Sequence, residues 1–84
     1  MNHTVHWRPA AEDALARLWT EADDREAVAR AADEMDALLR RDPVQVGESR
    51  ASRRRILIVR PLAIYFEVLS EDRMVFVTAV WRWA

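Results

Sequence analysis

The last third of the chain carries three apolar segments with very short connections between them, and this feature limits the possible folds more than any other. The segments are residues 56–59, 62–69 and 74–81. They are rich in β-branched and aromatic residues and are separated by turn-forming residues, which is typical of β-strands. Connections this short join antiparallel neighbours, whereas parallel strands need a long crossover. This part of the chain therefore predicts a three-stranded antiparallel meander.

The first half of the chain predicts one short strand and two amphipathic helices. Polar and apolar residues alternate over residues 3–7, which indicates a strand. Pro9 suits the first turn of a helix, and apolar residues then recur at helical spacing to form one stripe on each of two helices. The stripe residues are Ala11, Ala14, Leu15, Leu18, Trp19 and Ala22 in the first helix, and Val28, Ala31, Ala32, Met35, Leu38 and Leu39 in the second. We expect both stripes to pack on one face of a sheet.

The second helix is bounded by residues that favour helix ends. Asp23 can cap its N-terminus, with Glu26 at the capping-box position. Pro43 ends the helix, because proline disfavours helical geometry in the residue before it. Residues 43–52 are expected to form the one long loop, which contains Gly47, the only glycine.

This order of elements, β-α-α-β-β-β, predicts an α+β fold in which a helical hairpin packs on a small, mostly antiparallel sheet. Alternating β and α units are absent, so a parallel sheet is not expected. We interpret the 84 residues as a single domain, 1–84. A domain of this size buries only about 60–65% of its unfolded surface, so a binding partner would help to stabilise it.

The composition excludes several kinds of site. There is no cysteine, which rules out a disulfide, a thiolate nucleophile and a thiolate metal site. The two histidines, His3 and His6, fall on opposite faces of the first strand, and no glycine-rich phosphate loop or Ser/His/Asp arrangement is visible. We therefore expect neither a metal nor a cofactor. No apolar run approaches the ~18 residues of a membrane span and no signal-peptide pattern is present, so the cytoplasm is the expected compartment.

Charge is unevenly distributed along the chain. Residues 1–48 hold six arginines and eleven acids, a balance of −5, whereas residues 49–84 hold seven arginines and three acids, a balance of +4. Every cationic residue is arginine, whose planar guanidinium pairs with phosphate and stacks on bases. The basic half is therefore a candidate surface for nucleic acid or for an acidic protein.

Three consecutive arginines precede the first strand of the meander. Strand alternation places Arg53 and Arg55 on one face and Arg54 on the other. There they could bind RNA phosphates and stabilise the charge that develops when a phosphodiester is cleaved. They could equally form a solvated strand end or pair with acids such as Glu48 and Glu67. The residues alone leave both interpretations open.

The C-terminal residues form a second candidate site. Arg82 lies between Trp81 and Trp83, so it could hold a phosphate while an indole stacks on a base. Core packing is the expected role of Trp81. Trp83 could instead cover the sheet edge or form a dimer contact.

Short motifs follow one another in a fixed order along nearly the whole chain. They are residues 7–11 (WRPAA), 47–50 (GESR), 60–62 (RPL) and 80–82 (VWR). Together with the order of the elements, they resemble the RelE/ParE superfamily of toxins from type II toxin–antitoxin systems. The resemblance implies a toxin that a cognate antitoxin neutralises within a toxin–antitoxin hetero-oligomer.

RelE-like members cut mRNA in the ribosomal A site without a metal, using basic residues on the sheet and an acid–base residue near the C-terminus. The resemblance matches Arg53 and Arg55 to the basic pair on the strand after the helices, and Arg82 to the region after the last strand. It implies an mRNA interferase that inhibits translation, in which Arg55 and Arg82 are catalytic. The implied RNA-binding residues are Arg50, Arg53, Arg54, Arg60 and Trp83.

Two departures from the RelE-like pattern leave alternatives open. Ala63 stands where RelE-like nucleases often carry arginine, and no tyrosine or histidine follows the last strand before Ala84. ParE-like members share the fold but inhibit DNA gyrase by binding it, so they need no acid–base residue. An inactive remnant that only binds antitoxin is a further alternative, as is a plain interaction module.

Overall fold

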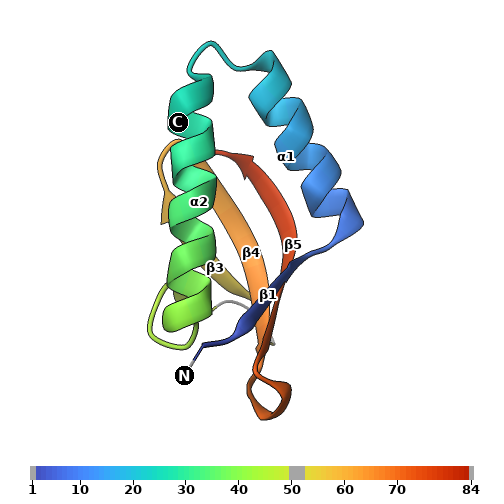
Figure 1. Ribbon diagram of the computed structural model, residues 1–84, viewed down its shortest axis with the longest axis vertical. Helices are drawn as coiled ribbons and strands as arrows, with labels where there is room; N and C mark the ends of the chain where they lie inside the picture. The colour runs from blue at the N-terminus through green and yellow to red at the C-terminus, as the bar shows by residue number, and fades with distance from the viewer. Residues whose placement is uncertain (1, 50–52, 84) are drawn as a thin grey trace.

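Two helices cover one face of a five-stranded sheet in the computed structural model, which describes residues 2–49 and 53–83 (Figure 1). The elements in chain order are β1 (Thr4–Trp7), α1 (Pro9–Glu21), α2 (Arg25–Arg41), β2 (Glu48–Ser49), β3 (Arg55–Val59), β4 (Leu62–Leu69), the 3-10 turn η1 (Ser70–Asp72) and β5 (Met74–Arg82). The predicted α+β class and the order of the helices and main strands are confirmed. Within the described residues, no helix is both long enough and apolar enough to cross a membrane.

The strand order in the sheet is β1-β5-β4-β3-β2. β3, β4 and β5 are antiparallel neighbours, as their short connections predict, and the turn between β3 and β4 contains a cis peptide bond between Arg60 and Pro61. β1 pairs in parallel with β5, and the elements between them, which include both helices, supply the long connection that a parallel pair requires. The sheet is therefore mostly antiparallel, and β4 lies at its centre.

Alternate residues of the central strands form the core beneath the helices. The largest fully buried side chains of these elements are Leu62, Ile64 and Phe66 on β4, Val75 and Val77 on β5, and Val28, Met35 and Leu39 on α2. Strand alternation places the intervening strand residues on the other face, away from both helices. We call this face the open sheet face; its residues on β4 and β5 include Ala63, Tyr65, Glu67, Phe76 and Trp81.

The structure places a short strand within the loop predicted over residues 43–52. This strand, β2, pairs with Arg55 and Ile56 at the edge of the sheet. Gly47 precedes β2 with φ 73°, and a Cβ atom there would lie 2.4 Å from the main-chain oxygen of Ile56. Only glycine fits this left-handed conformation and close approach. A strand of two residues has no periodic pattern, so the sequence does not predict it.

The N-terminus of α2 also differs from the prediction. The cap residue is Asp24 rather than Asp23, and its side chain makes no capping hydrogen bond. Both carboxylate oxygens of Asp24 instead accept hydrogen bonds from Arg82, at the end of β5. Arg25, the first residue of α2, donates to two carbonyl oxygens in the last turn of α1, one of which also accepts the main-chain N–H of the C-cap residue, Ala22. The predicted cap, Asp23, is therefore wrong. Asp24 occupies the cap position, and its carboxylate binds Arg82 of β5 instead of the main-chain N–H groups of α2.

Candidate functional site

Arg55, the first residue of β3, lies on the helix side of the sheet and is bound to the preceding loop. Its register partner on β4 is Phe66, a core residue. The guanidinium donates to the Ser49 hydroxyl at 2.9 Å and to three carbonyl oxygens within residues 44–47 at 3.2, 3.3 and 3.5 Å. Its Nε atom is buried and has no acceptor among the described residues. Arg55 therefore holds the loop against the sheet with both of its terminal nitrogens.

Arg82 forms an ion pair with two hydrogen bonds at the other end of the sheet. Its terminal nitrogens lie 2.9 and 2.7 Å from the two carboxylate oxygens of Asp24. These hydrogen bonds hold the pKa of the Asp24 carboxyl below its ordinary value and raise the pKa of Arg82. Both side chains remain 40% exposed, so a phosphate from solution can compete with the carboxylate for Arg82.

Replacing Arg82 with alanine is expected to raise the pKa of the Asp24 carboxyl toward its ordinary value of about 4, because both hydrogen bonds are lost. In the folded wild type, the pair stabilises the protein above about pH 4, and this contribution is lost as the pH falls through the lowered pKa of Asp24. A carboxyl ¹³C NMR titration measures the midpoint. Arg25→Ala is the matched control, since Arg25 bonds to carbonyl oxygens of α1. Equal midpoints in the wild type and Arg82→Ala would contradict the ion pair.

The two arginines predicted to be catalytic do not share a site. Arg55 lies opposite Phe66 and Arg82 lies opposite Leu62, on the two strands that flank β4. Four residues along a strand span about 13 Å and two strand spacings add about 10 Å across the sheet, so the two Cα atoms lie about 16 Å apart. Each guanidinium is also bound to its own partners. In this arrangement one phosphate does not contact both side chains, and the catalytic assignment stays a prediction.

The predicted RNA-binding residues fall into two groups at the two ends of β3. Arg53 and Arg54 are exposed and precede the strand, whereas Arg60 is exposed in the turn that follows it. Trp83 is 40% exposed, and its main-chain N–H donates to a carbonyl oxygen of that same turn. Arg50 lies outside the described residues. The predicted basic surface is therefore divided along the length of the sheet.

Arg54 reaches the open sheet face, where it lies over an aromatic pair. Its guanidinium carbon is 4.7 Å from the centroid of the Tyr65 ring, and that ring lies 4.7 Å from the Trp81 ring at an angle of 55°. Arg53 and Arg54 precede β3, which begins only at Arg55, so strand alternation does not fix the face of Arg53 and its predicted place beside Arg55 stays a prediction. The arginine beside these half-buried rings is thus Arg54.

A second group of an arginine and aromatic rings lies on the open sheet face, and the sequence analysis does not identify it. Arg8 lies 4.9 Å from the centroid of the Phe76 ring, which packs edge-on against His6 at 5.7 Å. These residues meet because β1 pairs with β5 and places His6 opposite Phe76. Alternation over residues 3–7 indicates the strand, but no local pattern identifies the strand with which it pairs.

The open sheet face offers guanidinium groups and aromatic rings as its chemistry. Such groups bind phosphates and nucleobases, and they also bind acidic and aromatic side chains of proteins. Across residues 2–49 and 53–83, no group of three or more His, Asp or Glu side chains is placed to hold a metal ion.

The fold has counterparts among solved structures, although no protein-family model and no curated protein sequence matches the chain. It is similar to the toxin–antitoxin complex RelBE2 from Mycobacterium tuberculosis, with 20% identity, a TM-score of 0.80, and coverage of 98% of this chain and 99% of that chain. It is similar to a chromosomal ParDE system from P. aeruginosa, with 16% identity, a TM-score of 0.76, and coverage of 98% and 97%. It is also similar to the intact E. coli RelBE complex, with 14% identity, a TM-score of 0.66, and 95% coverage of each chain. The protein therefore has the RelE/ParE toxin fold that its sequence predicts.

Proposed function

We propose that the protein is the toxin of a type II toxin–antitoxin system and that a cognate antitoxin neutralises it by binding. The RelE/ParE fold supports this proposal, because the similar structures from M. tuberculosis and E. coli are toxin–antitoxin complexes. The size of the chain is also consistent with it, since a domain of 84 residues gains stability by mass action when it binds a partner.

The geometry supports inhibition of a protein target better than it supports cleavage of mRNA. DNA gyrase is the candidate target. The observation that carries this choice is the separation of Arg55 from Arg82, each bound to its own partners. Cleavage of a phosphodiester needs groups that converge on one phosphate. Binding a protein needs an accessible surface with anchoring side chains, and arginine and aromatic residues are the commonest anchors. The open sheet face provides both types of residue in Arg54, Tyr65 and Trp81.

Ribosome-dependent cleavage of mRNA is the second candidate, and one observation favours it. The rings of Tyr65 and Trp81, tilted against each other, lie beside Arg54, and such a group binds single-stranded RNA by stacking on bases and pairing with phosphates. A positioned tyrosine hydroxyl can also transfer protons. Cleavage through Arg82 would require that side chain to exchange Asp24 for a phosphate.

The purified protein is expected to inhibit the supercoiling of plasmid DNA by purified DNA gyrase. Arg54→Glu is expected to weaken this inhibition by about tenfold or more, because it replaces a cation on the open sheet face with an anion. Gel electrophoresis of the plasmid measures the inhibition. The matched control is Arg30→Glu, which makes the same change at an exposed position on α2. Equal inhibition by the two variants would remove the open sheet face as the binding surface, and full supercoiling in the presence of the wild type would remove gyrase as the target.

A further inference from the structure

The open sheet face carries two groups in which an arginine lies beside aromatic rings, and the function proposed above uses only one of them. We call Arg54, Tyr65 and Trp81 the Arg54 group, and Arg8, His6 and Phe76 the Arg8 group. Arg54 precedes β3 and Arg8 follows β1, so the two arginines come from opposite sides of the central strands β4 and β5. Tyr65, Phe76 and Trp81 belong to those central strands.

The two groups lie close enough for one short segment of a partner to contact both. Phe76 is opposite Glu67, two residues along β4 from Tyr65, so the Cα atoms of Tyr65 and Phe76 lie about 8 Å apart. The axes of β1 and β3 are separated by three strand spacings, about 14 Å. An extended peptide covers this distance with about four residues.

The two arginines have no acidic partner among the described residues. Both side chains are exposed, and neither makes an ion pair or a hydrogen bond there. The main chain of Arg8 is held from two sides, because its N–H donates to Val77 of β5 and its carbonyl oxygen accepts the N–H of Glu12 of α1. The guanidinium of Arg8 therefore extends from a fixed position and is available to a carboxylate of a partner.

The surface between the two arginines is largely apolar. Tyr65, Phe76 and Trp81 are half-buried, so each ring keeps part of its surface accessible. Ile58 of β3 lies opposite Ala63 on the same face and is 39% exposed. Aromatic and arginine side chains are the commonest anchors in protein interfaces. The partner that fits this face is apolar in the middle and acidic at both ends.

Glu67 favours a protein over a nucleic acid as that partner. It lies opposite Phe76 and two residues from Tyr65, so it stands between the two groups. Its side chain is half-buried and makes no ion pair with any residue that the structure describes. A nucleic acid strand that ran from one arginine to the other would bring its phosphates close to this carboxylate, and like charges repel. A protein segment can carry its acids at its ends alone.

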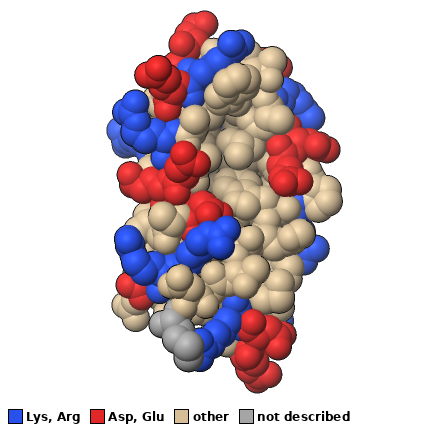
Figure 2. All heavy atoms as spheres, in the orientation of Figure 1, with Lys and Arg blue, Asp and Glu red and all other residues tan. Residues whose placement is uncertain are grey.

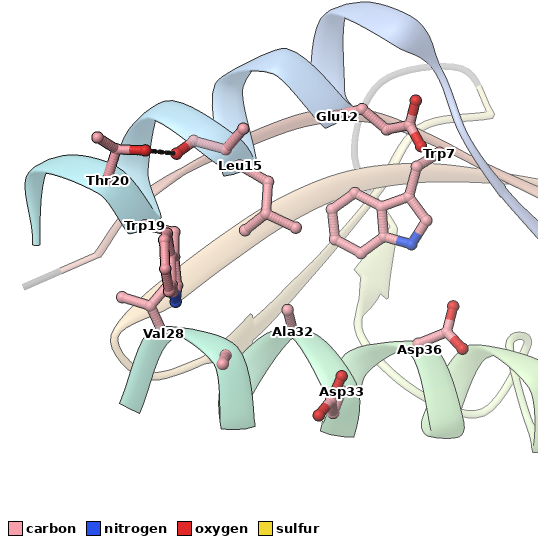
Figure 3. A pocket seen from close by; sticks show the side chains of 11 residues that line it. Trp7, Glu12, Leu15, Trp19, Thr20, Val28, Ala32, Asp33 and Asp36 are labelled. Atoms are coloured by element: carbon pink, nitrogen blue, oxygen red, sulfur yellow. Dashed lines mark hydrogen bonds between the residues drawn. The ribbon is translucent and has the colours of Figure 1, made fainter. Parts of the chain in front are cut away.

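The helix side of the molecule does not offer this chemistry. A groove of about 780 Å³ lies between α1 and α2, and its lining includes Trp19, which is 46% exposed, and the acids Glu12, Asp33 and Asp36 (Figure 3). None of the eleven lining residues is an arginine. Figure 2 shows this side of the molecule, where acidic and basic side chains are interspersed. An acidic segment is therefore attracted to the open sheet face and repelled from the groove.

We propose that the open sheet face binds an acidic segment of its protein target at two points, with carboxylates on Arg54 and Arg8 and apolar side chains on the rings between them. Arg8 and Phe76 then determine the choice of target together with the Arg54 group. This inference rests on the proposed function in taking a protein as the ligand. It adds the chemistry of the segment and the second point of contact.

A synthetic peptide tests the chemistry of the segment. It is about eleven residues long, with three leucines at its centre, two glutamates on each side of them, and a fluorescent label for anisotropy. The inner glutamates are then four positions apart, which matches the spacing of β1 and β3. We expect the chain to bind this peptide at least about tenfold more tightly than the same peptide with lysines in place of glutamates. Equal binding of the two peptides would overturn the proposal, as would tighter binding of a single-stranded RNA of the same length.

Arg8→Glu tests the second point of contact. It reverses the charge beside Phe76, and we expect it to weaken binding of the glutamate peptide by about fivefold or more. The variant is expected to fold, because an acidic side chain is favourable at the N-terminus of α1, and circular dichroism checks this. Arg17→Glu is the matched control, since it makes the same change at an exposed position of α1 and should bind as the wild type does. Equal binding by the two variants would overturn the proposal.

The gyrase assay separates this inference from the proposed function. If Arg54→Glu weakens the inhibition of supercoiling and Arg8→Glu does not, the Arg54 group stands as the binding surface and the second point of contact is wrong. If the wild type leaves supercoiling unaffected but binds the glutamate peptide through both arginines, gyrase is not the target and the two-point surface stands.

Discussion

Phe66→Ala is expected to lower the free energy of unfolding by about 3–5 kcal/mol, which is the usual cost of removing a buried aromatic ring. Phe66 is fully buried at the centre of β4. Its ring also lies against the loop before β2, because a Cβ added at Gly47 would approach Phe66 Cε1 to 3.1 Å. The substitution therefore leaves a cavity in the core and removes a surface on which that loop rests. A domain of this size has only about 5–10 kcal/mol of stability, so the loss is a large part of it.

Phe76→Ala is the matched control, because Phe76 is the only other phenylalanine and lies on the open sheet face. Its ring is partly exposed and contacts His6 and Arg8, so the expected loss is about 1–2 kcal/mol. Urea denaturation followed by circular dichroism measures both losses. Equal losses in the two variants would contradict the placement of the core between the sheet and the helices.

Arg55→Leu is expected to lower the free energy of unfolding by about 2–4 kcal/mol. Leucine preserves part of the apolar stem but removes four hydrogen bonds, so the Ser49 hydroxyl and the carbonyl oxygens within residues 44–47 lose a charged donor. Arg54→Leu is the matched control, since Arg54 is exposed and its described contact is with the Tyr65 ring. Its expected loss is about 0.5–1 kcal/mol, also measured by urea denaturation.

The same two variants separate a structural role of Arg55 from a catalytic one. If Arg55 holds the loop, Arg55→Leu lowers the urea midpoint, and any loss of toxicity follows the loss of folded protein. If Arg55 is instead a catalytic group, Arg55→Leu abolishes toxicity although Arg55→Leu and Arg54→Leu unfold at the same urea concentration. The second result would contradict the structural role and restore the mRNA-cleaving interpretation.

The meander and the helices were predictable from the sequence because their signals are local. Strand alternation and turn residues within residues 62–82 gave the bounds of β4, and those of β5 to within one residue. Pro9 and the apolar stripe that follows it likewise marked α1. Local patterns of this kind depend on residues a few positions apart in the chain, so these elements can be predicted without knowing the tertiary contacts.

The candidate site was less predictable, because it depends on contacts between distant residues. Asp24 and Arg82 are 58 positions apart, and no pattern around either residue indicates the other. The faces of the three arginines depend on where β3 begins, and a shift of one residue moves a side chain to the opposite face. The apolar stripe containing Trp19 shows which side of α1 faces inward, but not how far α1 stands from α2.

The fold alone does not distinguish the two actions proposed for the protein. The RelBE2 and ParDE structures match the chain with similar TM-scores of 0.80 and 0.76. The distinction depends on whether the arginines converge on one phosphate. In the structure, Arg55 is bound to a loop, Arg82 to Asp24, and Arg54 to the open sheet face. This arrangement favours a binding surface over a nuclease centre.

The central claim is that the protein is a toxin that acts without cutting mRNA. The most direct test is to produce this chain alone in bacteria and map newly formed mRNA 5′ ends. We expect growth to arrest while the 5′-end map stays the same as in uninduced cells, and DNA breaks to accompany the arrest. New 5′ ends within translated codons would contradict this account and establish ribosome-dependent cleavage. Normal growth on induction would contradict the toxin role itself.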